Sequence, residues 1–339
     1  MPSFRTGAVT DLLSERAGFQ RVRVDLGDDQ LARAYVLTQL TGPVAVGDRV
    51  VCNTTAVELG LGTGGWHVVH WNLARESWSE PGPGHIMKLR YTSLQADTGA
   101  GEEDHPDVPA TLDGTPVVVC TVHSQVPAVV VAALDVRLGT RIAYVMTDGA
   151  ALPLAFSDLV ATMVERDLLV GTVTAGHAFG GDLEAVNVAS ALVLARHVLD
   201  ADLIVVGMGP GVVGTGTTLG PTSLEAAGAL DTVAALGGQP VACLRVSSGD
   251  LRDRHQGVSH HTRTVLDLVR SPVRLAATPD LGPLDRHVVV EVIAPDTPSL
   301  LTSHGLHVTT MGRTPEQDPA YFIAAGQAGA LGASLIALP

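Results

Sequence analysis

The chain has 339 residues and a formal net charge of −14, and 46% of its residues are hydrophobic while only 4% are aromatic. This length allows two domains and a large core built from Val, Ala and Leu. The acidic surface disfavours nucleic acids and anionic membranes as partners. No apolar run approaches about 20 residues, and the first residues lack the pattern of a signal peptide, so we expect a cytoplasmic protein.

Up to about residue 75, the chain has the pattern of short strands separated by turns. FQRVRVD (19–25) and RAYVLTQ (33–39) alternate apolar and polar residues, and DRVVCN (48–53) and WHVVHWN (66–72) are looser candidates. The pattern predicts a β-rich domain over residues 1–75, either an antiparallel meander or a small barrel.

Residues 76–115 are rich in Pro, Gly and acidic residues, which predicts a connector with one ordered segment, HIMKLRYTSLQ. This segment contains Lys88, the only lysine of the chain. Lys88 could move towards an anionic ligand of the following domain, or it could lie on a solvated edge strand, where lysine is common.

From residue 116 onward, apolar runs alternate with helical patterns. PVVVCTVHSQ, RIAYVMTDG, LVGTVTAGH, DLIVVGMG and PVACLRVSS are each followed by such a pattern. Strands of this kind are typical of a parallel sheet that is covered on both faces. We therefore expect an α/β fold, with a doubly wound, mostly parallel sheet over residues 116–339 behind the β-rich N-terminal domain. The last helix should begin at Asp318 and Pro319, an N-cap and first-turn pair.

The three cysteines, Cys52, Cys120 and Cys243, all lie inside apolar runs. Their odd number and the lack of a spacing pattern argue against a disulfide framework. We expect three buried free thiols in a reducing compartment.

Polar residues follow each predicted strand of the second domain. The first three strands are followed by His123, by Thr147 and Asp148, and by Gly176 and His177; later strands are followed by a glycine-rich loop and by Ser247. Because ligands of open α/β sheets bind beyond the carboxyl ends of the strands, we expect a functional site at this edge.

The loop GMGPGVVGTGTTLG is the densest group of glycines in the chain. It satisfies G-x-G-x-x-G, but a further loop separates the motif from the helix, and no Gly-Lys-Ser/Thr exists, so neither a dinucleotide fingerprint nor a P-loop is indicated. A wide cradle for a phosphate or carboxylate is the favoured interpretation, and a turn for close helix–sheet packing is the alternative. The cradle residues are Gly209, Gly211, Gly214, Thr215, Gly216, Thr217 and Thr218. Thr222 and Glu225 fit a capping box of the helix that follows.

A metal site is also possible at the strand ends, from Asp148 with His123, His177 or one of the pair His260 and His261, although the spacing matches no standard zinc signature. Adjacent helical residues point about 100° apart, so we expect His260 and His261 not to reach one ion together. Asp182 is placed as the N-cap of a helix. Arg313 is a further cationic candidate.

Four strings, YVMTDGAALPLA, TAGHAFGGDLEAVN, GMGPGVVGTGTTLG and RHQGVSHHT, carry a resemblance to a known family. Together they resemble a family of bacterial proteins that is classed as a domain of unknown function, and the resemblance runs along nearly the whole chain. It implies a bacterial soluble protein, and it implies no activity, cofactor or catalytic residue.

The function must therefore be inferred from the residues themselves. The first hypothesis is an enzyme that acts on a small phosphorylated or carboxylated metabolite, with His177 or His123 as general acid or base and Asp148 orienting the histidine or binding a metal. The alternative is a non-catalytic metabolite-binding or sensor protein. The sequence identifies no cofactor, and it leaves a homo-oligomer open.

Overall fold

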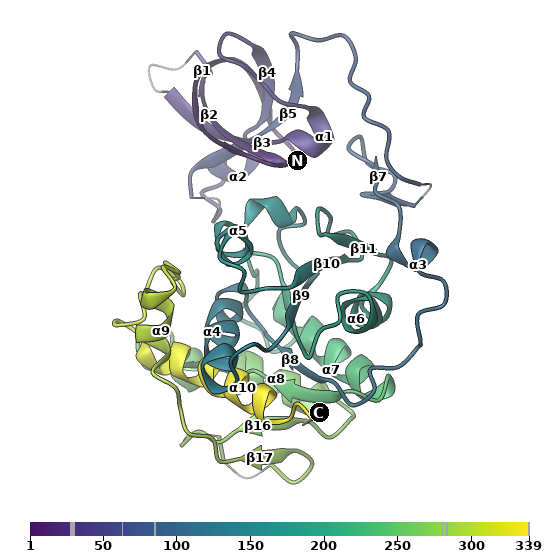
Figure 1. Cartoon of the computed structure of the whole chain (residues 1–339). Helices are drawn as coiled ribbons and strands as arrows, with labels where there is room; N and C mark the ends of the chain where they lie inside the picture. Colours follow the sequence, from purple (N-terminus) through teal and green to yellow (C-terminus); the bar gives the residue numbers. More distant parts are fainter. Residues whose placement is uncertain (28–30, 63, 85, 280, 283, 338–339) are drawn as a thin grey trace. The chain divides into compact units, whose positions relative to one another are not determined.

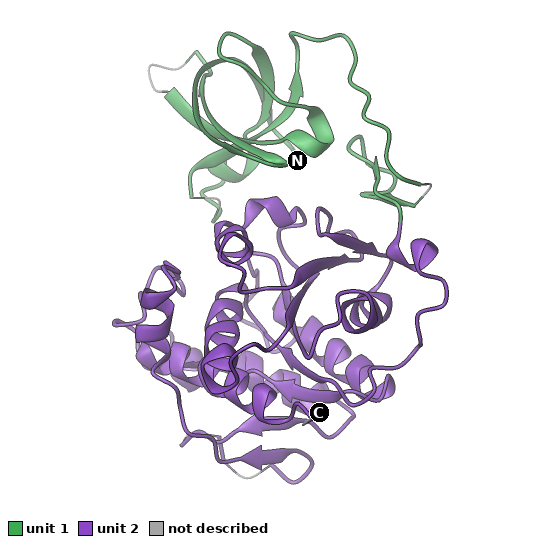
Figure 2. Ribbon diagram, in the orientation of Figure 1, with its two compact units in different colours: residues 1–99 green, residues 100–339 purple. Residues whose placement is uncertain are grey.

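The computed structural model of the chain describes residues 1–27, 31–62, 64–84, 86–279, 281–282 and 284–337. It forms two compact units, residues 1–99 and residues 100–339 (Figure 2). We call them the barrel unit and the sheet unit. The division falls inside the connector that the sequence suggests at residues 76–115.

The barrel unit contains a closed barrel of five strands in the order β1-β2-β3-β5-β4 (Figure 1). The strands are β1 (Phe4–Arg16), β2 (Phe19–Asp25), β3 (Leu31–Leu37), β4 (Arg49–Asn53) and β5 (Trp66–Asn72). All pairs are antiparallel except β3 with β5. This is the strand order of an OB-fold barrel. Of the two predicted forms of the β-rich domain, the structure therefore confirms the small barrel.

The alternation of apolar residues in these strands fills the barrel. Val22, Val24, Ala34, Val36 and Val50 are completely buried and belong to one apolar cluster. Every second residue points to the interior of the barrel, as the period of a strand requires. The remaining elements of this unit are short: α1 (Thr38–Thr41), α2 (Thr55–Glu58), β6 (Met87–Lys88) and β7 (Ala96–Asp97).

The sheet unit contains an eight-stranded sheet in which every pair of neighbours is parallel. Its order is β11 (Leu183–Ala185), β10 (Gly171–Ala175), β9 (Ile142–Thr147), β12 (Leu203–Met208), β8 (Pro116–Val119), β13 (Gln239–Ala242), β16 (Arg274–Ala276) and β17 (Val288–Val290). The predicted α/β fold with a parallel sheet is confirmed.

Helices cover both faces of this sheet, because its strands are apolar on both sides. Val117 and Val119 of β8 pack with one set of helices, and Val118, on the opposite face, packs with the other. The first set comprises α6 (Val188–His197), α7 (Glu225–Ala235) and α8 (His260–Leu268). The second comprises α4 (Val126–Val136), α5 (Asp158–Glu165), α9 (Thr297–Ser303) and α10 (Pro319–Ser334).

After the neighbouring strands β8 and β12, the chain continues on opposite faces of the sheet. From β8 it passes through α4 to β9, and from β12 it passes through α7, on the other face, to β13. Where adjacent strands connect to opposite faces, a crevice forms beyond their carboxyl ends. The topology therefore places the expected ligand crevice at the ends of β8 and β12.

One of the two predicted N-cap residues, Asp182, does not begin a helix in the structure. Residues Leu183–Ala185 form the edge strand β11, so α6 begins only at Val188, with Asn187 as its N-cap. Asp182 is therefore not an N-cap. Its carboxylate instead accepts hydrogen bonds from the backbone and hydroxyl of Thr172, both at 2.8 Å. The last helix does begin at Pro319 after Asp318, as predicted.

Among the described residues, no helix combines the length and the apolar character that crossing a bilayer requires. Cys52, Cys120 and Cys243 are free and buried, as predicted.

Candidate functional site

The carboxyl ends of the strands lie at one edge of the sheet unit. Met208 of β12 pairs with Thr147 of β9, while Val206 pairs with Val119 of β8, which in turn pairs with Ala242 of β13. The polar residues that follow these strands therefore share this edge, as expected for a parallel sheet.

His123 follows β8 and contacts the end of β12, where the topology leads us to expect the crevice. Its Nδ1 donates to the carbonyl oxygen of Met208 at 3.0 Å, and its Nε2 accepts from the hydroxyl of Ser157 at 2.7 Å. Burial lowers the pKa of His123 to about 4, so the ring is neutral. Because both nitrogens are bonded, proton transfer by His123 would first require one of these bonds to break.

Asp148 acts on the turn that carries His177. The carboxylate accepts a hydrogen bond of 2.9 Å from the backbone N–H of His177. Gly176 adopts φ +67°, and a Cβ at this position would lie 2.9 Å from Cγ of Asp148. The structure thus brings Asp148 and His177 together through the backbone, and an orienting contact with the imidazole remains a prediction.

Glu225 is an acidic group at this edge whose role the sequence interpretation missed. Its carboxylate accepts hydrogen bonds from the hydroxyl of Thr147 and from the backbone of Gly149. Burial and the nearby charge of Asp148 raise its pKa above the ordinary value. The predicted capping box is wrong, because a 3₁₀ turn over Thr222–Leu224 precedes α7 and directs Glu225 towards β9.

The glycine-rich loop emerges from the end of β12. A Cβ at Gly209 would collide with the carbonyl oxygen of Ala151, and the Ala151 N–H donates to the carbonyl of Pro210 at 3.0 Å. The loop then pairs with itself, because Gly214 bridges to Pro221. Close backbone approach therefore explains the first glycine without a ligand.

The exposed part of this loop carries the predicted hydroxyl groups. Those of Thr215 and Thr217 bond to each other at 2.8 Å, and both residues and Thr218 are exposed. Gly211 adopts φ +100°, and a Cβ at Gly216 would lie 3.9 Å from an Nη atom of Arg254. The cradle of Gly209, Gly211, Gly214, Gly216 and these threonines remains a prediction, and the contact with Arg254 connects it to the next strand end.

Ser247, the predicted ligand contact after β13, is engaged by Asp318. The hydroxyl of Ser247 donates to the Asp318 carboxylate at 2.6 Å, and the backbone of Ser248 donates to the same group at 3.0 Å. Ser247 is 2% exposed. Its role in this structure is to attach the loop to the beginning of α10.

The buried carboxylate of Asp250, three residues after Ser247, forms ion pairs with three arginines. Asp250 forms ion pairs with Arg252 at 2.7 Å, with Arg313 at 3.3 Å and with Arg245 at 3.6 Å. These hydrogen bonds and positive charges hold the pKa of Asp250 well below its usual range. Arg245 is 3% exposed, and its Nε has no hydrogen-bond partner among the described atoms.

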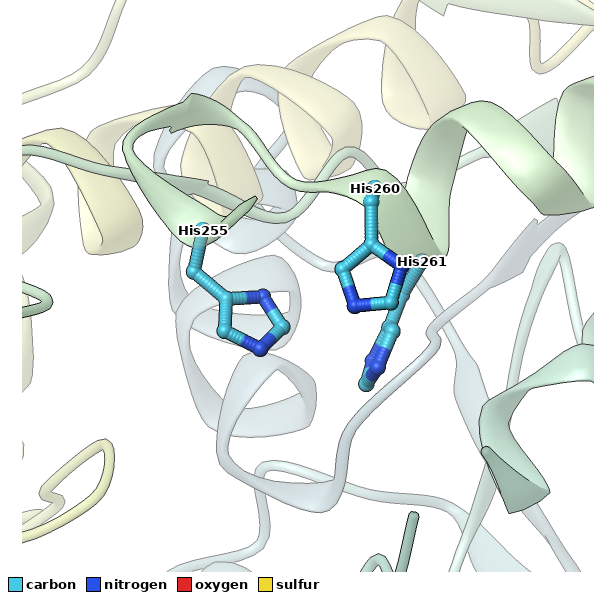
Figure 3. A group of neighbouring side chains, drawn as sticks. All are labelled: His255, His260 and His261. Atoms are coloured by element: carbon cyan, nitrogen blue, oxygen red, sulfur yellow. The ribbon is translucent and has the colours of Figure 1, made fainter. Parts of the chain in front are cut away.

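Three histidines converge beside these arginines (Figure 3). His255 comes from a 3₁₀ turn, Asp253–His255, while His260 and His261 begin α8. One ring nitrogen of each residue lies within 4.8 Å of one nitrogen of each of the others. We call these residues the histidine cluster. The divergent Cα–Cβ bonds led us to expect that His260 and His261 do not easily reach one ion together, but their rings turn towards each other, with centroids 4.3 Å apart.

The histidine cluster consists of neutral imidazoles. Burial, reinforced by the charge of Arg245, lowers the pKa of His255 to about 3 and that of His261 to about 4. Burial and Arg254 lower the pKa of His260 as well. Nδ1 of His255 bonds to the hydroxyl of Ser259 at 2.7 Å, and Nε2 of His260 is buried without a partner among the described atoms.

Lys88 belongs to the barrel unit, in β6, and is 1% exposed. The alternative of a solvated edge lysine is therefore wrong. A contact of Lys88 with a ligand of the sheet unit remains a prediction.

Comparison with known proteins supports the resemblance seen in the sequence. A family model described as a protein of unknown function (DUF3866) matches residues 33–329. The chain matches no curated protein sequence.

Proposed function

Since the chain belongs to this family of proteins of unknown function, DUF3866, which carries no activity to transfer, we propose a function from the site alone. The sheet unit binds a small phosphorylated or carboxylated metabolite at the carboxyl edge of its sheet and acts on it as an enzyme. The glycine-rich loop and the arginines beside the histidine cluster bind the anion.

The observation that carries this proposal is that Arg254 is exposed beside the glycine-rich loop without a partner among the described residues. Its side chain is exposed, and it forms no ion pair or hydrogen bond with another described residue. It lies next to the glycine-rich loop at Gly216 and acts electrostatically on His260 and His261. A guanidinium that forms no ion pair with another described residue is the group to which a carboxylate or phosphate would bind through two parallel hydrogen bonds.

Proton transfer at this edge has two candidate groups besides the fully hydrogen-bonded His123. His177, with Asp148 to orient it, is carried over from the sequence, and Glu225, whose pKa is raised by burial, suits a general acid. The paired acidic groups at the ends of β9 and α7 are the feature that favours an enzyme over a simple binding protein.

The test of anion binding uses inorganic phosphate and succinate as probes, with calorimetry at constant ionic strength. We expect Arg254→Gln to weaken binding of at least one probe by about 10- to 100-fold, the loss of a hydrogen bond to a charged group. The matched control is Arg270→Gln, which removes an exposed arginine beyond the opposite end of α8. Equal affinities in both variants would place the anion elsewhere.

The second candidate, a metabolite-binding or sensor protein without chemistry, is favoured by the full hydrogen bonding of His123. The two are separated with a metabolite found by native mass spectrometry of the purified protein. An enzyme should lose turnover in His177→Ala or Glu225→Gln while affinity stays within about tenfold. Loss of affinity in a protein that never turns the metabolite over would favour the sensor.

A further inference from the structure

The histidine cluster has the composition of a metal site with an open position. We propose that His255, His260 and His261 together bind one divalent transition-metal ion, best matched by zinc, and leave a fourth position for water or an anionic ligand. The inference goes beyond the proposed function, because metal binding is measurable without any metabolite and each can fail without the other.

The three ring nitrogens need to move only slightly closer together to bind one ion. A tetrahedral ion with bonds of about 2.0–2.1 Å to nitrogen separates its ligand nitrogens by about 3.4 Å. The three ring nitrogens lie within 4.8 Å of one another, and the ring centroids are 4.3 to 5.0 Å apart. Rotation of the rings, which all face a common space in Figure 3, would bring the nitrogens to bonding distance.

Unsatisfied hydrogen bonding supplies a second observation that points to a ligand. Nε2 of His260 is buried and has no partner among the described atoms, and a buried polar atom in this state is destabilising. His255, which is 1% exposed, has its Nδ1 bonded to Ser259, so its Nε2 remains available to an ion. Such a hydrogen bond on the distal nitrogen is the usual way in which metal-binding histidines are oriented.

The chemistry of the donors favours a borderline ion over a hard one. Three imidazoles with no carboxylate suit zinc, copper, iron or nickel and do not suit calcium or magnesium. Imidazole binds such ions in its neutral form, so affinity for the metal should fall at acidic pH. Three protein ligands and one open position are typical of catalytic zinc sites rather than structural ones.

The surrounding charges set what occupies the open position. Arg245 contacts Nδ1 of His261 at 3.4 Å and shares the single carboxylate of Asp250 with Arg252 and Arg313, whereas Arg254 forms no ion pair with another described residue. These cations weaken the binding of a bare dication, and an anionic fourth ligand would offset that effect. The fourth ligand should therefore be hydroxide or an oxygen of a phosphate or carboxylate.

Calorimetry with Zn²⁺, on full-length protein first treated with EDTA and dialysed into a non-coordinating buffer, tests the inference. We expect one ion per chain. His260→Ala should lower the affinity by more than about 100-fold, because even outer partners of metal ligands contribute 10- to 100-fold. His307→Ala, which removes an exposed histidine outside the cluster, should leave the affinity unchanged.

Two further measurements separate loss of binding from loss of folding. His260→Gln preserves a polar side chain of similar length, and the melting temperatures of both variants in EDTA show whether they fold. In the wild-type protein, Co²⁺ should give the intense visible absorption of a site with fewer than six ligands, and this signal should vanish in folded His260→Gln. The absence of a stoichiometric ion, or equal losses in His260→Ala and His307→Ala, would overturn the inference.

Discussion

His123 shows how one buried side chain makes stability depend on pH. Its pKa is lowered to about 4 in the folded protein, while an unfolded histidine titrates near 6.5. Protons therefore bind preferentially to the unfolded chain between these values, and the protein loses stability as the pH falls below 6.5. The contribution lost between pH 7 and pH 5 is about 2 kcal/mol.

The His123→Gln variant measures this contribution. Glutamine can donate to Met208 and accept from Ser157 without titrating, so the variant should be less stable than the wild type at pH 7 but closer to it at pH 5. Denaturant unfolding at the two pH values gives the difference directly. A stability difference that does not change with pH would show that the histidine is protonated as easily as in the unfolded chain.

The residues at the strand ends illustrate which parts of the site the sequence can predict. Asp148 and His177 follow apolar strands directly, so the rule for parallel sheets places them at the correct edge. Glu225 instead follows the 3₁₀ turn Thr222–Leu224, and His255 is the last residue of the 3₁₀ turn Asp253–His255. Such short turns decide where a side chain points, and they are too short to show a periodicity from which they could be predicted.

At the scale of elements, glycines fix the packing of α10. The helix is buried on nearly all sides, and a Cβ at Gly332 would lie 2.8 Å from Val118 of the sheet. At Gly329, a Cβ would collide with the carbonyl oxygen of Val129 in α4, beside which α10 runs (Figure 1). Gly329 therefore allows the backbones of α10 and α4 to approach each other closely, and Gly332 allows α10 to pack closely on the sheet.

We therefore expect Gly329→Ala to lower the free energy of unfolding by about 1–3 kcal/mol through overpacking. Gly228→Ala in α7 is the matched control. Outside the backbone of its own helix, no described atom lies within 4 Å of the Cβ that it adds, so the better helix propensity of alanine should raise stability by about 0.5–1 kcal/mol. Denaturant unfolding of both variants measures the contrast. A stabilising effect of alanine at both sites would mean that α10 and α4 are further apart than described.

Elements with a clear period were predictable, and those without one were missed. The strands from Phe19 to Asp25 and from Trp66 to Asn72 match their predicted ranges. The first strand, Phe4–Arg16, escaped prediction because two irregularities, after Val9 and after Leu12, shift its register and break the alternation of apolar residues. Edge strand β11 has only three residues, too few for a period.

At the scale of the whole molecule, the net negative charge and the candidate site residues are concentrated in one of the two units. The excess of acidic over basic residues lies almost entirely in residues 100–339, the unit that also contains the histidine cluster and the unpaired Arg254. A surface with this excess of negative charge repels polyanions, so we expect the anion site that we propose to take small anions. The proposed metabolite is small for this reason.

The two units also have separate apolar interiors, which predicts how the protein unfolds. Barrel residues form one apolar cluster, and two others line the faces of the sheet. Cys52 is buried in the barrel, and Cys120 and Cys243 are buried in the sheet unit. Because each compact unit has its own apolar core, we expect the barrel thiol and the sheet thiols to become reactive in separate transitions.

Pulsed thiol labelling along a denaturant series, read by mass spectrometry of peptides, measures each transition. In native conditions all three thiols should resist the reagent, because burial limits its access to each of them, and burial also raises the pKa of Cys52 and of Cys120. Val22→Ala removes packing from the barrel core only, so it should move the Cys52 transition to lower denaturant and leave the sheet thiols unaffected. If all three thiols respond together to this change, the barrel and the sheet fold as one cooperative structure, and the metabolite bound by one unit would stabilise both.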